Sequence, residues 1–134
     1  MEHILLDDNS HKNDNYLYEK ITSWLNTLLS VNFLGKDIII KQLFGASYEV
    51  HGKHEYISIK FNPNKCEPYP YNIRVPISMQ CRQFNGNIVD CLLHVINGFV
   101  NELEIYNMDL TDFDAGFSLD NLIYRIDEEI DLTE

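Results

Sequence analysis

The stretch LLHVINGFVNELEIY, residues 92–106, constrains the fold of this chain more than any other part of its sequence. Two apolar segments with a period of two flank Asn97-Gly98, a dipeptide typical of a tight β-hairpin turn. Simple pairing around a two-residue turn would place Leu93 opposite Glu102 and put carboxylates on both faces, which a sheet with one buried face does not tolerate. We therefore predict a three-residue loop with Gly98 as its αL bulge residue, which restores the alternation.

This register divides the hairpin between two faces of a sheet. The core face is expected to hold Val89, Cys91, Leu93, Val95, Leu103 and Ile105. The opposite face is expected to hold Asp90, His94, Glu102 and Glu104, with His94 and Glu102 opposite or diagonal to each other. The preceding hairpin, around QFNGNI, needs an odd loop for the same reason, and this loop brings Met79 and Cys81 beside Cys91 and Leu93.

The N-terminal third of the chain has the period of helices. A helix capped by Asp14 or Asn15 is predicted from the apolar spacing of Leu17, Ile21, Trp24, Leu25, Leu28 and Leu29. The segment GKDIIIKQLFGA predicts a second helix closed by Gly45, although its β-branched run at residues 38–40 leaves a strand open. Residues 1–13 are expected to be a flexible extension.

The rest of the chain alternates with a period of two. We expect a hairpin turning at Gly52-Lys53, a strand over residues 72–82 in which Pro76 marks an edge or a bulge, and a last strand in NLIYRID. The chain is therefore expected to be one α+β domain over residues 1–134. In it, two N-terminal helices pack on an antiparallel β-meander of five to six strands.

The charge is concentrated in the last quarter of the chain. The net charge is -11, yet residues 1–100 hold ten acidic and nine basic side chains, whereas residues 101–134 hold eleven acidic ones and only Arg125. This distribution disfavours nucleic acid and anionic membranes as partners and favours a basic protein, although acidic segments also serve solubility alone.

Cysteine usage and hydropathy bear on the compartment. Three cysteines without a CxxC spacing, Cys66, Cys81 and Cys91, favour free thiols and a cytoplasmic location. No apolar run approaches the length of a membrane span, and the N-terminus lacks the pattern of a signal peptide. We therefore expect no membrane association.

Two side-chain sets carry residue types suited to chemistry. Asp90, His94, Glu102 and Glu104 could perform general acid–base catalysis on one sheet face, but such groups need a concave, partly dry site, and no phosphate loop or lid pattern accompanies them. We favour a solvated or partner-facing stripe and no enzymatic activity. His51 and His54 lack a third ligand at a set spacing, so we expect no metal and no cofactor.

Aromatic residues in irregular segments indicate a protein-binding surface. Acidic side chains beside loop aromatics have the composition of such a patch, unless the aromatics fold back onto the core. The predicted partner contacts are Asp109, Asp112, Phe113, Asp114, Phe117, Glu102, Glu104, Tyr69 and Tyr71.

The segment LLHVINGFVNELEIYNMD, residues 92–109, resembles the hairpin signature of a family of small bacterial proteins. Residues 93–95, Gly98 and residues 102–106 match that signature, Val100 replaces its usual leucine, and residues 107–109 fit its acidic end loosely. The helical start and the β-meander also resemble the family across residues 15–126. Some proteins of this kind are immunity partners of polymorphic toxins, including contact-dependent growth inhibition systems.

The resemblance implies an immunity protein that binds and neutralises a cognate bacterial toxin domain, such as a basic nuclease. The signature is structural and assigns no catalytic residue. The alternatives from other classes are a small enzyme using Asp90, His94, Glu102 and Glu104, or an adaptor domain.

Overall fold

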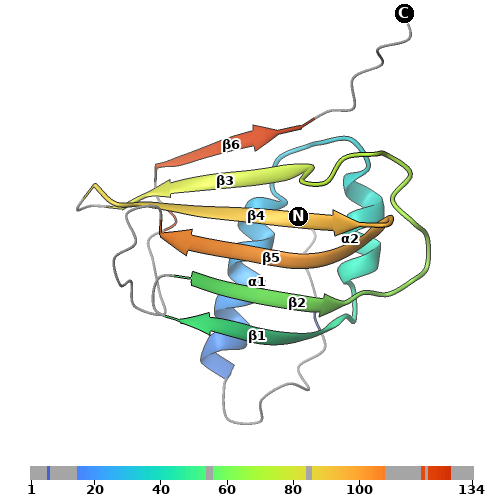
Figure 1. Cartoon of the computed structure of the whole chain (residues 1–134), viewed down its shortest axis with the longest axis horizontal. Helices are drawn as coiled ribbons and strands as arrows, with labels where there is room; N and C mark the ends of the chain where they lie inside the picture. The colour runs from blue at the N-terminus through green and yellow to red at the C-terminus, as the bar shows by residue number, and fades with distance from the viewer. Residues whose placement is uncertain are drawn as a thin grey trace, which may run out of the picture.

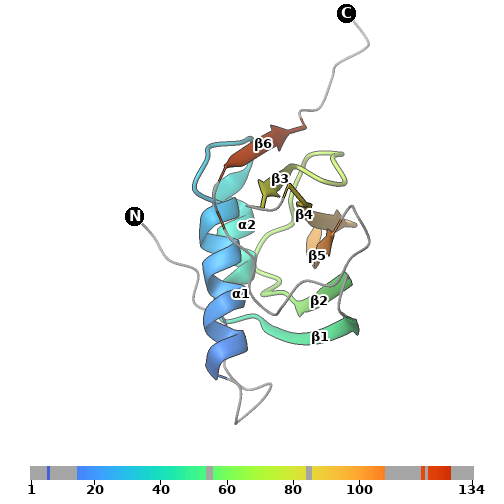
Figure 2. The same cartoon turned by 90° about the vertical axis from the view of Figure 1, so that its left-hand side faces the viewer.

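The computed structural model describes residue 6, residues 15–53, 56–83 and 86–107, residue 119 and residues 121–127. Two helices lie on one face of a six-stranded antiparallel sheet, as the two views in Figures 1 and 2 show. The helices are α1 (Asn15–Leu28) and α2 (Lys36–Leu43). The strands are β1 (Ser47–Lys53), β2 (Tyr56–Asn62), β3 (Ile77–Arg82), β4 (Ile88–Ile96), β5 (Phe99–Asn107) and β6 (Leu122–Ile126).

The sheet order is β1-β2-β5-β4-β3-β6, so the α+β class is confirmed but the continuous meander is wrong. The strands β3, β4 and β5 form a meander whose last strand pairs with β2, and β6 returns to pair with β3. Figure 1 shows β1 and β6 at the two edges. The two long connections, residues 63–76 and 108–121, permit these crossings, whereas tight turns hold hairpin partners side by side.

The core lies between the helices and one face of the sheet. From α1, residues spaced by three and four are buried: Ile21, Trp24, Leu25 and Leu28. Ile39 and Leu43 of α2 join them, and the β-branched run is helical because its one-sided burial outweighs the weak local preference for a strand. Gly45 follows α2 with a φ of 72°, as expected of an αL cap.

The β4–β5 hairpin has the predicted faces but not the predicted loop. Val95 pairs with Val100 around a two-residue turn in which Asn97 and Gly98 have φ values of 53° and 87°. The register then shifts, so that His94 pairs with Glu102 and Asn101 is the extra residue of a bulge in β5. The three-residue loop is therefore wrong. A bulge inside the strand shifts the pairing by one residue, as a three-residue loop would, and so places the same side chains on each face. It also keeps the favoured two-residue Asn-Gly turn.

The core face of this hairpin is confirmed, since Cys91, Leu93, Leu103 and Ile105 are fully buried. The β3–β4 hairpin has the expected odd loop: Arg82 pairs with Ile88, and Met79 pairs with Cys91. Cys81 and Cys91 are both buried and free. The pKa of the Cys91 thiol is raised, first by its hydrogen bond with Cys81 and then by burial, so it stays protonated.

Two strand boundaries differ from the prediction. The strand expected over residues 72–82 begins only at Ile77, because Pro76 has no N–H for the sheet. In the β1–β2 hairpin Lys53 pairs with Tyr56, so Gly52 lies inside β1 and the turn does not lie at residues 52–53. Within the described part of the chain, no helix is long and apolar enough to cross a membrane.

Candidate functional site

The outer face of the sheet, away from the helices, carries a network of polar side chains that we call the sheet-face network: Tyr56, Ser58, Lys60, Arg74, His94, Glu102 and Glu104. Antiparallel pairing of β2 with β5 sets Ser58 opposite Glu104 and Lys60 opposite Glu102. Pairing of β4 with β5 sets His94 opposite Glu102, as predicted. Three central strands therefore bring six of these side chains within contact of one another, and Arg74 reaches His94 from the loop at residues 63–76.

Glu102 is only 8% exposed and lies at the centre of the network. The Ser58 hydroxyl donates a hydrogen bond of 2.5 Å to Oε2, and Lys60 Nζ lies 3.2 Å from Oε1. Burial raises the pKa of this carboxyl, but the hydrogen bonds from Ser58 and Lys60 and the charge of Lys60 outweigh burial and hold the pKa below its usual value. Glu102 is thus an internally paired carboxylate. Of the two forms of the predicted stripe, solvated or partner-facing, the solvated one is wrong for this residue.

His94 and Glu104 form the second part of the network. His94 Nε2 lies 2.9 Å from Glu104 Oε1, and Arg74 Nε donates to His94 Nδ1 at 3.3 Å. Both ring nitrogens of His94 are therefore engaged, Nδ1 by Arg74 and Nε2 by Glu104. The ring lies between a guanidinium and a carboxylate.

Tyr56 joins the two carboxylates of β5. Its hydroxyl donates to Glu104 Oε2 at 3.1 Å and lies 3.4 Å from Glu102 Oε2. Burial and the hydrogen bond to Glu104 raise the pKa of Tyr56 to about 12, so the phenol is a firm donor at neutral pH. Farther along the same face, burial and the hydrogen bond to Asp90 raise the pKa of Tyr106.

The acid–base groups of the sheet-face network form hydrogen bonds with one another. A pocket of about 300 Å³ lies beside it, but Asp90, His94, Glu102 and Glu104 do not line that pocket. Among the residues that the structure describes, no group of three or more His, Cys, Asp or Glu could hold a metal ion. The contacts among Ser58, Glu102, His94 and Glu104 link β2, β4 and β5 across the outer face of the sheet.

Tyr69 is buried, so the expectation of an exposed contact residue is wrong for this tyrosine. Its hydroxyl donates to the Leu34 carbonyl at 2.6 Å, and its backbone N–H donates to the Gly98 carbonyl at 2.7 Å. A side chain at Gly35 would clash with its ring. Tyr71 is half-buried and meets the Tyr69 ring edge-on at 5.2 Å. The other possibility considered for the loop aromatics, that they fold back onto the core, is therefore confirmed for Tyr69.

Gln42 is a buried residue that the sequence reading did not single out. Its amide donates to the carbonyls of Glu67 and Gly98, both at 2.8 Å, and accepts from the Val100 N–H at 2.8 Å. This side chain ties α2, the loop at residues 63–76 and the β4–β5 turn together. The sequence feature that could have indicated a buried Gln42 is its position directly before the apolar Leu43 of the same helix.

The predicted acidic loop lies outside the described residues. That holds for Asp109, Asp112, Phe113, Asp114 and Phe117, and for His54 of the histidine pair. The described residues include nine basic and eight acidic side chains, a net charge of +1. The remaining residues carry thirteen acidic side chains and one lysine, so the whole negative excess belongs to them.

Strand β6 lies in sequence between two of the acidic segments. Eight of the remaining acidic residues fall between positions 108 and 134, on either side of this strand. On β6 itself Ile123 is 54% and Ile126 39% exposed. The sequence reading treated β6 only as a last strand and did not single out these two side chains.

Comparisons with models of known protein families, with curated proteins and with solved structures find no match to this chain.

Proposed function

We propose that the protein is an immunity protein, which binds a cognate bacterial toxin domain of basic character, such as a nuclease, and neutralises it in the cytoplasm. The observation that supports this proposal is the distribution of charge: the described residues have a net charge of +1, and the remaining residues hold the whole negative excess. A concentration of carboxylates steers a basic partner by long-range attraction.

The proposed contact surface is the outer face of β6 with the acidic segments on either side of it. Its apolar anchors are the exposed Ile123, which pairs with Gln80 on that face, together with Phe113 and Phe117 of the preceding segment. Apolar side chains within a polar rim are typical of the centre of a protein interface. Asp109, Asp112 and Asp114 are assigned to the rim.

Glu102 and Glu104 are not part of this surface in our proposal. Their carboxylates already accept hydrogen bonds from Ser58, Tyr56 and His94, and a partner would have to displace these groups. We assign the two residues to stabilisation of the sheet.

The proposal is tested with the gene next to the one that encodes this chain. If that gene encodes a secreted protein with a variable C-terminal domain, expression of the domain should kill cells, and co-expression of this chain should protect them. The purified domain should bind the chain more weakly as salt is raised. Absence of binding to any neighbour-encoded domain would overturn the proposal.

A further inference from the structure

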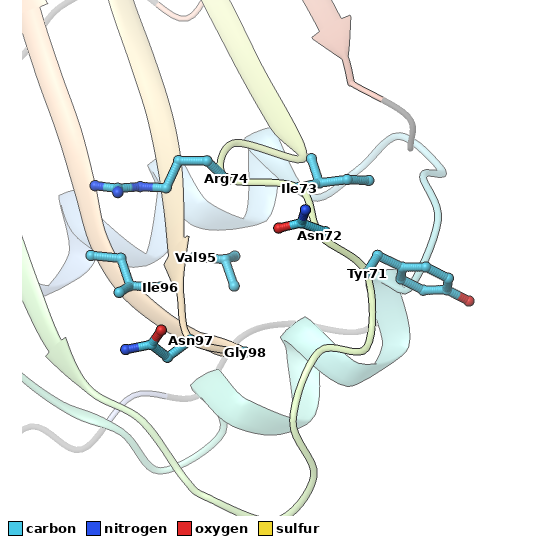
Figure 3. Close-up of a pocket in the computed structure, with 8 residues that line it drawn as sticks. All are labelled: Tyr71, Asn72, Ile73, Arg74, Val95, Ile96, Asn97 and Gly98. Atoms are coloured by element: carbon cyan, nitrogen blue, oxygen red, sulfur yellow. The ribbon is translucent and has the colours of Figure 1, made fainter. Parts of the chain in front are cut away.

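A pocket of about 300 Å³ lies between the loop at residues 71–74 and the end of β4 (Figure 3). The loop supplies Asn72, Ile73 and Arg74, and the strand with its turn supplies Val95, Ile96 and Asn97. This volume is at the lower end of the range of small-molecule sites. The proposed contact surface on β6 shares no residue with the pocket.

Arg74 is held in place without being neutralised. Its Nε donates to His94 Nδ1 at 3.3 Å, and His94 is fixed from its other side by Glu104. Among the described residues, neither terminal nitrogen of the guanidinium has a hydrogen-bond or ion-pair partner. Within the described part of the chain, no carboxylate lies within ion-pair distance of Arg74. The sheet-face network thus orients a cation beside the pocket.

The pocket also has neutral donors and an apolar wall. Asn72 and Asn97 are exposed, and neither side-chain amide hydrogen-bonds another described residue. In Figure 3 the Asn72 amide points toward Val95 across the opening, whereas the Tyr71 ring points away from it. Ile73 and Val95 are buried, whereas Ile96 is half-buried and supplies accessible apolar surface next to the polar groups.

We propose that this pocket binds a carboxylate that carries a short aliphatic chain. A guanidinium offers parallel N–H donors that match a carboxylate, and amides can complete its hydrogen bonds. A phosphate dianion fits less well, because the pocket has one cation and no helix N-terminus to balance two negative charges. The aliphatic part would contact Ile96, which lies on the same face of β4 as His94.

The inference is tested on the full chain with N-acetyl-leucine as the probe. N-acetyl-leucine amide, which lacks the negative charge, is the control compound. Binding is followed by backbone amide shifts in nuclear magnetic resonance. We expect the acid to shift residues 71–74 and 95–98 at millimolar concentration and the amide to bind at least about tenfold more weakly. No shift with the acid, or equal binding of acid and amide, would overturn the inference.

The matched variants are Arg74→Gln and Arg82→Gln, since Arg82 is an exposed arginine at the end of β3, away from the pocket. Arg74→Gln should weaken binding of the acid at least about tenfold, and Arg82→Gln should leave it within about twofold. If Arg74→Gln fails to fold, Arg74→Lys is the second variant. It keeps the positive charge but lacks the paired N–H donors of the guanidinium, so it should bind the acid more weakly than the wild type. Unchanged binding in the Arg74 variant contradicts the proposed site.

A third probe distinguishes the source of the carboxylate. A pentapeptide that ends in a free leucine carboxylate presents the same group at the end of a chain. Binding of this peptide at the strength of N-acetyl-leucine assigns the pocket to a protein C-terminus, and binding of the small acid alone assigns it to a free metabolite. Either result supports a carboxylate site at Arg74.

Discussion

Glu102 and Glu104 of β5 differ from the carboxylates around β6 in what surrounds them. The β5 pair is enclosed by Ser58, Tyr56 and His94, and Lys60 neutralises Glu102 directly. Next to β6, Asp127 is exposed. Its ion-pair partner, Arg125 at 3.7 Å, is also exposed to solvent. A carboxylate therefore stabilises the sheet in one region and supplies surface charge in the other. Charge counted along a sequence does not distinguish the two roles.

The largest expected effect is on stability, at Glu102. Glu102→Ala leaves the Ser58 hydroxyl and Lys60 without their acceptor on a nearly buried face, so the free energy of unfolding should fall by about 2 kcal/mol. The control Asp127→Ala removes an exposed carboxylate and should change it by less than roughly 0.5 kcal/mol. Urea denaturation measures both. Equal losses for the two variants would erase the distinction between the regions.

A second effect concerns the hairpin that presents Glu102 and His94. Gly98 has a φ of 87°, and an added Cβ would lie 3.1 Å from Pro68 Cβ, so Gly98→Ala should cost on the order of 1 kcal/mol or more. Gly45 has a φ of 72° with open space around its Cα, so Gly45→Ala measures backbone strain alone and should cost less. Denaturant midpoints of the two variants provide the test. A greater loss at Gly45 would contradict the close approach of loop and turn.

A smaller effect is expected from pH. Because the pKa of Glu102 is lowered in the folded protein, its ionised form stabilises the fold above the pKa of the unfolded chain, roughly 4.3. This contribution is lost as the pH falls through the folded-state pKa. The stability difference between wild type and Glu102→Gln should therefore shrink as the pH is lowered from 7 to about 3. A difference that stays constant over this range shows that the charge of Glu102 does not stabilise the fold.

The helices and the two faces of the hairpin could be predicted because both follow from local periodicity. Trp24 and Leu28 recur at helical spacing, and Leu93 and Leu103 alternate with polar residues. The position of the bulge could not be predicted, because a bulge at Asn101 and a three-residue loop at Gly98 produce the same alternation.

The candidate site depended on pairings between distant segments. The pairing of Lys60 with Glu102 joins β2 to β5, and no local pattern indicates that these two hairpins are neighbours. Burial of Tyr69 likewise requires Leu34 and Gly35 from the turn before α2. Sequence reasoning identified the polar residues of the β4–β5 hairpin but assigned them to solvent or to a partner protein, since the residues that they contact lie elsewhere in the chain.

The association rate with the neighbour-encoded toxin domain tests the central claim most directly, measured at low and high salt for two variants. Neutralising Asp109, Asp112 and Asp114 together to asparagine should slow association and flatten its salt dependence, because these carboxylates are proposed to steer the basic partner. Glu102→Gln should leave both the rate and its salt dependence unchanged. The opposite pattern, an unaffected triple variant and a slowed Glu102 variant, would contradict the account and place the partner on the sheet face.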